Sequence, residues 1–164
     1  MTSASDRRLW ALVAVIIAVD QLTKHWALGR LSDGRTIDLV GSLRFNLAFN
    51  RGMAFSRGSG LGPIIGALAF VIVIVIVLWM RRSARGLPAV AAGLIVGGAV
   101  GNLVDRLFRG EAWLRGAVVD FIDLQWFPVF NVADSAITIG ALLMVLASLR
   151  QRPVAGTEVV EQRD

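Results

Sequence analysis

The sequence predicts an all-α membrane protein with four transmembrane helices and a small β-hairpin and loop subdomain on the extracytoplasmic side. Of its 164 residues, 55% are hydrophobic and only 18% are charged, which is too apolar for an ordinary soluble domain. The apolar residues also fall into four stretches of roughly 17–20 residues, long enough to cross a hydrocarbon core of about 30 Å.

We expect the four helices at about residues 9–28, 61–80, 87–104 and 132–149. The first is interrupted by Asp20 and Lys24, the second contains the unbroken apolar run AFVIVIVIVLWM, and the third is rich in small residues. Arg7 and Arg8 before the first stretch are compatible with a secretory signal peptide. No small-x-small cleavage pattern precedes Asp20, however, so we expect an uncleaved first helix.

Two of the connecting segments are long. In residues 29–60 the segments TIDLV and SLRFNLAF flank Gly41 and are typical of a short hairpin. Residues 107–130 carry Trp113, Trp126, Phe127 and Phe130, and such aromatic residues are enriched at membrane interfaces. We expect residues 1–150 to form a single four-helix transmembrane domain, followed by a polar, disordered cytoplasmic tail at 151–164.

Four spans place both termini on one side of the membrane and both long loops on the other. Most of the polar residues within or beside the helices then gather on the loop side: Asp20, Lys24, Asn50, Asn102, Asp105, Arg106, Asp120, Asn131 and Asp134. The arginines divide equally between the two sides. The group Arg81, Arg82 and Arg85 in a tight turn, with Arg7 and Arg8 before the first helix, favours cytoplasmic termini.

The composition excludes several classes of chemistry. The net charge is +5, but no soluble basic domain is present to bind nucleic acid, and a cationic rim against anionic lipid headgroups fits better. The absence of Cys removes a thiol nucleophile, and His25 is the only histidine. Without an HExxH motif or further ligands we predict no metal and no cofactor.

Each polar motif has a purely structural interpretation. Asp20 and Lys24, one helical turn apart, could be a buried ion pair. Asn131 is a good helix N-cap, and Asp134 in the first turn would complement the helix dipole. Asp120 could be an ordinary loop carboxylate, with Asp123 as a competing candidate for any catalytic role.

The polar residues at the end of the third helix likewise have both a structural and a functional interpretation. Asn102, Asp105 and Arg106 share one side of its end. Arg106 could bind a peptide carbonyl, a carboxylate or a lipid phosphate, or be a helix-terminal charge balanced by Asp105. The glycines of GGAVGN indicate close helix packing.

In combination the motifs favour hydrolysis by two carboxylates. Asp120 and Asp134 at one membrane edge could share a proton, because like charges a few ångströms apart resist double ionisation. The rival within the chain is serine–lysine chemistry, using Lys24 with Ser56 or Ser135. It ranks lower because Asp20 lies one turn from Lys24.

Five motifs in order closely resemble the bacterial lipoprotein signal peptidases, or signal peptidase II: DQLTK at 20–24, FNRGMAF at 49–55, GGAVGNLVDR at 97–106, VVDF at 118–121 and FNVAD at 130–134. The resemblance covers most of residues 10–149. It implies an aspartyl endopeptidase of the bacterial inner membrane, with its site near the extracytoplasmic face. The implied substrates are prolipoproteins with a diacylglyceryl Cys, cut just before that Cys.

The resemblance also implies residue roles. Asp120 and Asp134 would be the catalytic dyad, and substrate or inhibitors of the globomycin type would bind at Asn50, Asn102, Arg106 and Asn131. Supporting roles would fall to Asp20, Lys24, Gly52 and Asp105. Two rivals from other classes are a small transporter or proton conductor and a non-catalytic membrane assembly factor. The gathering of acids at one face and the lack of inverted repeats disfavour the transporter.

Overall fold

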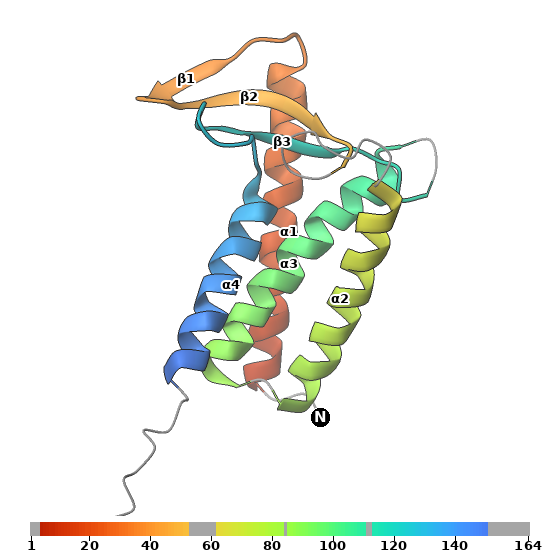
Figure 1. Ribbon diagram of the computed structural model, residues 1–164, viewed down its shortest axis with the longest axis vertical. Coiled ribbons are helices and arrows are strands. Elements are labelled where there is room, and N and C mark those ends of the chain that lie inside the picture. Colours follow the sequence, from red (N-terminus) through yellow and green to blue (C-terminus); the bar gives the residue numbers. More distant parts are fainter. Residues whose placement is uncertain (1–3, 53–61, 84, 111–112, 151–164) are drawn as a thin grey trace, which may run out of the picture.

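The computed structural model describes residues 4–52, 62–83, 85–110 and 113–150. Along the chain lie α1 (Ala4–Leu31), β1 (Ile37–Val40), β2 (Leu43–Asn50), α2 (Gly62–Ser83), α3 (Gly86–Phe108), β3 (Val118–Asp123) and α4 (Val132–Arg150). The four helices stand side by side, and the three strands lie across the end of the bundle opposite to the N-terminus (Figure 1).

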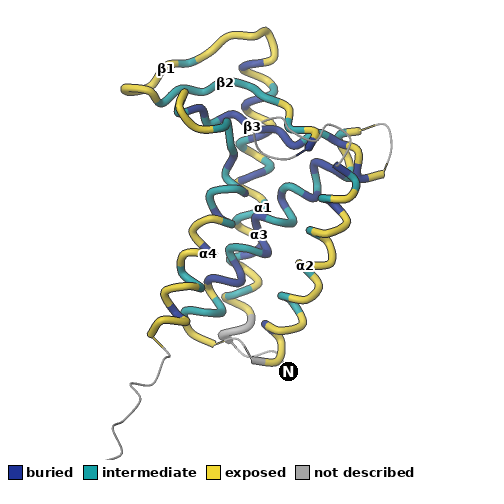
Figure 2. The backbone as a smooth tube through the Cα atoms, viewed as in Figure 1, coloured by how far each residue is buried: buried dark blue, intermediate teal, exposed yellow. Residues whose placement is uncertain are grey.

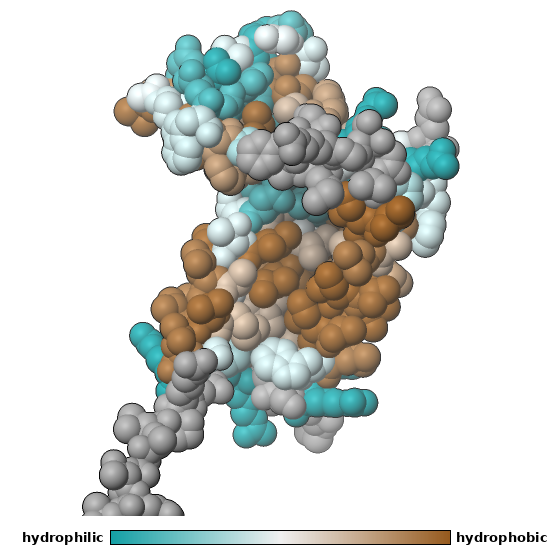
Figure 3. Space-filling view, viewed as in Figure 1, coloured by the Kyte–Doolittle hydropathy of each residue, from teal (hydrophilic) through white to brown (hydrophobic). Residues whose placement is uncertain are grey.

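All four helices are long and apolar enough to cross a membrane, which confirms the predicted fold class. A hydrophobic band covers the bundle below the sheet in Figure 3, with hydrophilic surface at both ends. The exposed face of α2 is almost wholly aliphatic or aromatic, as lipid contact requires. Burial is concentrated instead on α3 and β3 (Figure 2).

The helices extend beyond the apolar stretches that predicted them. α1 begins at Ala4 and ends at Leu31, and α3 continues to Phe108. Hydropathy marks the part of a helix that lies in hydrocarbon, whereas polar residues continue the helix outside it. As a result Asp105 and Arg106 lie within α3 and not beyond its end. The tail predicted at 151–164 lies outside the described residues.

The predicted hairpin around Gly41 is confirmed: β1 and β2 pair antiparallel, and Gly41 has a positive φ of 56°. A third strand, β3, pairs antiparallel with β2 and places Asp120 opposite Ala48. Residues 118–123 were expected to be part of a loop, and this expectation was wrong. The segment VVDFID is buried along nearly its whole length, and β-branched and aromatic residues favour such a strand.

The sheet rests on the end of α1. Ala27, Leu31 and Phe121 form a buried cluster there, and the rings of Trp26 and Phe45 meet edge to face with centroids 5.1 Å apart. Trp26 also contacts the ring of Phe121, with centroids 6.3 Å apart. These contacts hold β3 against the end of α1.

Two glycines of the GGAVGN motif allow α3 to approach its neighbours. A Cβ at Gly101 would lie 2.6 Å from Oδ2 of Asp20 on α1, and a Cβ at Gly98 would collide with the backbone oxygen of Ala133 on α4. Any larger residue would push the helices apart. The predicted close packing is therefore present, and it brings Asp20 and the start of α4 against α3.

Candidate active site

Asp120 and Asp134 are brought to one cavity by a strand and a helix. Asp120 lies in β3 and is 3% exposed, whereas Asp134 is half-buried in the first turn of α4. The chain between them doubles back, since Phe130 N donates to Ile122 O at 3.0 Å. Both carboxylates consequently line the same cavity of about 820 Å³.

The cavity is mainly apolar away from the carboxylates. Its walls come from the end of β2, the segment 124–130 and the first two turns of α4. Asn50, Ser135 and Thr138 are the other polar residues on its surface among the described residues. A few polar groups in an apolar cavity are typical of ligand sites.

Asn131 touches both carboxylates. Its Nδ2 donates to Oδ1 of Asp120 at 2.6 Å, and its backbone N donates to Oδ2 of Asp134 at 3.2 Å. In return, Asp134 N donates to Oδ1 of Asn131 at 2.9 Å. Asn131 therefore is the helix cap that the sequence predicted, and the same cap joins the two acids.

Asn102 holds Asp134 from the opposite side. Its Nδ2 donates to Oδ1 of Asp134 at 2.8 Å, while its own Oδ1 accepts from Lys24 Nζ at 2.9 Å and from Asn131 Nδ2 at 3.1 Å. An ammonium group can only donate, so Lys24 requires the amide oxygen on its side. The NH₂ group of Asn102 must then face Asp134.

Lys24 is completely buried and fully partnered. Its Nζ lies 2.9 Å from Asp20 Oδ2 and 2.9 Å from Asp105 Oδ2, so the predicted Asp20–Lys24 pair is present. With Asn102 these contacts use all three ammonium donors. Asp20 Oδ1 also accepts from Ala133 N at 3.0 Å, which ties the network to the start of α4.

This arrangement disfavours serine–lysine chemistry. The donors of Lys24 are taken, and Ser135 Oγ donates to Asn131 O at 3.0 Å. Ser56 lies outside the described residues. Within the part of the chain that the structure describes, no group of three or more His, Cys, Asp or Glu residues is placed to hold a metal ion.

Asp123, the competing carboxylate, faces other partners. Its Oδ2 accepts from Arg44 Nε at 2.8 Å and from Asn46 Nδ2 at 3.1 Å, and its Oδ1 accepts from Gln125 N at 2.7 Å. Burial alone would raise the pKa of Asp123, but these hydrogen bonds outweigh it and lower the pKa below its ordinary value. Asp123 is therefore held as an anion.

Asp120 has the opposite electrostatic character. Burial raises its pKa, and the neighbouring Asp134 carboxylate raises it further, to about 7. Hydrogen bonds from Asn131 and Asn50 act against this shift without cancelling it. Such a carboxyl retains a proton near neutral pH, as a shared-proton pair requires.

Arg106 and Gly52 lie beside the pair. Arg106 is 6% exposed, and its Nη2 donates to Gly52 O at 3.1 Å. Gly52 N in turn donates to Oδ1 of Asn50 at 3.1 Å. Among the described residues Asn50 reaches the cavity surface, whereas Asn102, Arg106 and Asn131 do not form part of its lining.

Two members of the buried network were not singled out from the sequence. Gln21 Nε2 donates to Gly101 O at 3.0 Å and lies 3.2 Å from carboxylate oxygens of both Asp20 and Asp105. Arg109 Nε donates to Asp105 Oδ1, the oxygen that Gln21 also contacts, at 2.6 Å. The position of Gln21 inside the DQLTK motif was the available signal.

Comparison with known proteins gives a consistent assignment. Residues 12–150 match the family model described as signal peptidase (SPase) II. The chain is 42% identical over 145 residues to the lipoprotein signal peptidase of Mycobacterium leprae, covering 87% of this chain and 72% of that protein. It is 41% identical over 142 residues to that of Rhodococcus jostii, covering 86% and 72%.

The fold also matches a solved structure. A bacterial membrane enzyme determined at 2.3 Å resolution by the in meso method superposes with a TM-score of 0.79 and 28% identity, over 94% of each chain. A second, determined at 1.9 Å, superposes with a TM-score of 0.76 and 29% identity, over 88% of this chain and 94% of the other.

Proposed function

The chain belongs to the signal peptidase II family, and we propose that Asp120 and Asp134 are the catalytic dyad of its peptidase activity. It is an aspartic endopeptidase that removes signal peptides from prolipoproteins, cutting just before the lipidated Cys. The observation that carries the dyad is that both carboxylates line one cavity and are joined through Asn131.

The two carboxyl groups share one proton and therefore have different roles in hydrolysis. The ionised carboxylate removes a proton from water as the water oxygen attacks the scissile carbonyl carbon. The protonated carboxyl donates a hydrogen bond to the developing oxyanion. As the C–N bond breaks, the dyad gives the leaving amine the proton that it took from water, which returns the pair to its singly protonated state. Asn102 and Asn131 hold the two acids in this geometry through the hydrogen bonds described above.

The cavity suits a lipid-modified precursor that arrives within the membrane. Ile139 on α4 lines the cavity and is half exposed, and α4 continues below it with Leu142 and Leu146 also facing outward. Acyl chains on the precursor could follow this apolar surface to the dyad. Membrane lipids would share the surface, and globomycin-type cyclic peptides would compete for the same cavity.

A cleavage assay with matched precursors tests this function. Each buried methylene contributes about 0.8 kcal/mol, so removing the acyl chains should lower kcat/KM by at least about tenfold. Purified protein should therefore cleave a diacylglyceryl precursor and leave the unlipidated form almost intact. Equal cleavage of both forms would contradict the role of the lipid, and a globomycin-type inhibitor should block the turnover that is observed.

We further propose that the protein lies in the bacterial inner membrane, with both termini cytoplasmic and the dyad near the extracytoplasmic face. The sheet and the dyad share one end of the bundle, and Arg81 and Arg82 lie at the other, in the last turn of α2. A basic cytoplasmic end follows the usual charge bias of membrane proteins.

Cysteine labelling can check this orientation without background, because the native chain has no Cys. In intact cells from which any outer membrane has been removed, an impermeant thiol reagent should label Asp38→Cys and Arg115→Cys. It should reach Arg82→Cys only after lysis. The reverse pattern would place the dyad on the cytoplasmic side.

A further inference from the structure

Residues 124–130, called here the aromatic loop, form one wall of the active-site cavity. Of the fourteen described residues that line the cavity, six come from this loop: Leu124, Trp126, Phe127, Pro128, Val129 and Phe130. Its rings contact one another in sequence, with centroids 6.1 Å apart for Trp126 and Phe127 and 5.9 Å apart for Phe127 and Phe130. The position of this loop sets the width of the cavity beside the dyad.

Asp123 ties the first turn of the aromatic loop to the sheet. Its Oδ1 accepts from Gln125 N at 2.7 Å, and Gln125 has a positive φ of 68°, which a non-glycine residue adopts only when its surroundings hold it there. Gln125 Nε2 also donates to Ser42 O in the hairpin at 3.0 Å. The loop therefore leaves β3 in a direction imposed by these contacts.

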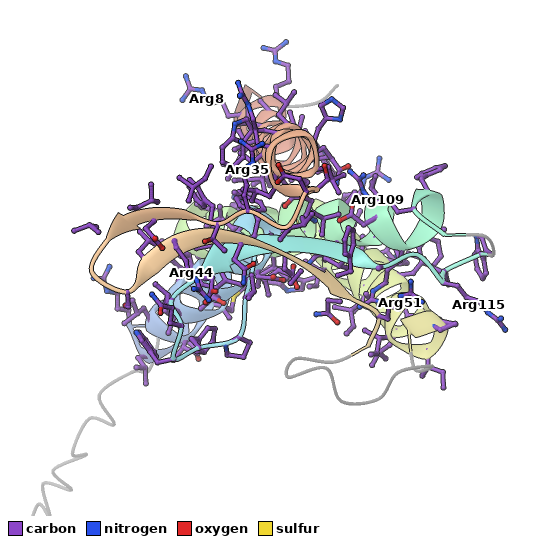
Figure 4. All side chains as sticks on the ribbon, turned by 90° about the horizontal axis from the view of Figure 1, so that it is seen from above. Arg8, Arg35, Arg44, Arg51, Arg109 and Arg115 are labelled. Carbon is purple, nitrogen blue, oxygen red and sulfur yellow. The ribbon has the colours of Figure 1, made fainter. Side chains whose placement is uncertain are left out.

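The other oxygen of Asp123 is anchored on β2. It accepts from Arg44 Nε at 2.8 Å and Asn46 Nδ2 at 3.1 Å, and Arg44 lies directly opposite Asp123 in the strand register. Figure 4 places Arg44 on the sheet above α4, far from Arg51 and Arg115. Asp123 is only 4% exposed whereas the Arg44 side chain is 31% exposed, so these charge-assisted bonds are partly shielded from water.

We propose that Asp123 is a positioning residue for substrate specificity: with Arg44 it holds the aromatic loop as the wall that receives the acyl chains of the precursor. This inference rests on the proposed function and adds to it, because Asp123 touches neither the dyad nor the cavity. Pairing of β2 with β3 would need only the bond between Arg44 and Asp123. The hydrogen bond that Asp123 accepts from Gln125 N is not needed for that pairing. That bond acts on the loop.

The test is a set of steady-state measurements with Asp123→Asn and Arg44→Gln. Asn at 123 presents an NH₂ group to either Arg44 or Gln125 N, so one donor loses its acceptor. For a long-chain diacylglyceryl precursor, KM should rise about fivefold while kcat stays within about twofold, because affinity and not the chemical step is affected. A short-chain diacylglyceryl precursor should show little change in KM.

The double variant should raise KM no more than either single change, since both substitutions break the same connection between the sheet and the aromatic loop. Asp33→Asn is the matched control: Asp33 and Arg35 form an exposed ion pair in the α1–β1 connection, and its loss should leave both constants unchanged. An unchanged KM for the long-chain precursor in the Asp123 and Arg44 variants would overturn the proposal. So would an equal rise for both precursors, or a fall in kcat alone in a variant that melts like the wild type.

These outcomes are separable from failure of the proposed function. If Asp120→Asn and Asp134→Asn kept full turnover, the dyad would be wrong whatever the Asp123 data showed. A loss of fold in the Asp123 variant would appear as a lower active fraction, which reduces the apparent kcat and leaves KM unaltered. It would therefore not imitate the expected result.

Discussion

Replacing either Asp120 or Asp134 with Asn is expected to lower turnover of a lipidated precursor by at least about 10³-fold. Asn preserves the size of the side chain but can neither accept the proton of the attacking water nor donate one to the leaving amine. General acid–base catalysis contributes about 10²–10⁴-fold, and both of its steps pass through this pair. Because the two acids act as a unit, the double variant should be little worse than either single one.

The measurement is cleavage by each purified variant, with its melting temperature as the check on folding. Asp123→Asn is the matched carboxylate control, since it lies in the same strand as Asp120 and, at a saturating concentration of precursor, should keep kcat within about twofold despite its expected rise in KM. Substantial turnover by a folded Asp120→Asn or Asp134→Asn variant would remove the mechanism.

The same shared proton predicts the shape of the pH profile for kcat/KM. Burial and then the Asp134 carboxylate raise the pKa of Asp120 to about 7, so activity should fall as pH rises through this region and the pair loses its proton. At acidic pH both carboxyls are protonated, no base remains, and activity should fall again. The two apparent pKa values belong to the pair and not to either residue.

Replacing Lys24 with Met is expected to destabilise the protein by roughly 3–5 kcal/mol, the usual effect of removing one partner from a buried ion pair. Asp20 and Asp105 are both fully buried against Lys24, and Met would leave Asp20 without a cation and Asp105 with Arg109 alone. The loss should appear as a lower melting temperature in detergent. Asp33→Asn, in an exposed pair, should leave the melting temperature nearly unchanged.

A second variant separates positioning from stability in this network. Asn102→Asp retains an oxygen for Lys24 and Asn131 but presents a carboxylate, instead of an NH₂ group, to Asp134. Turnover should fall while melting changes less than in Lys24→Met. A Lys24→Met protein that melts like the wild type would show that the buried pair contributes no stability.

Hydropathy and the even number of spans were sufficient to predict the bundle and the side of the membrane on which the polar residues gather. They predicted less about the ends of helices, because a helix such as α3 continues past the apolar stretch into polar residues like Arg106. β3 was missed for a different reason. A six-residue segment between two loops gives no periodic signal of its own, and its pairing with β2 is a long-range contact.

Within the candidate site, the motifs predicted which residues gather but not where each side chain points. Asn102 and Asn131 were expected from the resemblance to bind substrate or inhibitors, and that role stays a prediction. In the structure their amide groups donate to the carboxylates of Asp134 and Asp120, the proposed dyad. The orientation of Asn102 depends on the ammonium group of Lys24, nearly 80 positions earlier in the chain, and spacing within a motif carries no information about such a partner.

The two acids belong to different parts of the molecule: Asp120 to a sheet seated on α1 by Phe121 and its aromatic neighbours, Asp134 to a helix inside the bundle. With the proposed dyad, cleavage requires both parts to be in place. A change that displaces the sheet from α1 should therefore reduce activity even where the four helices remain folded.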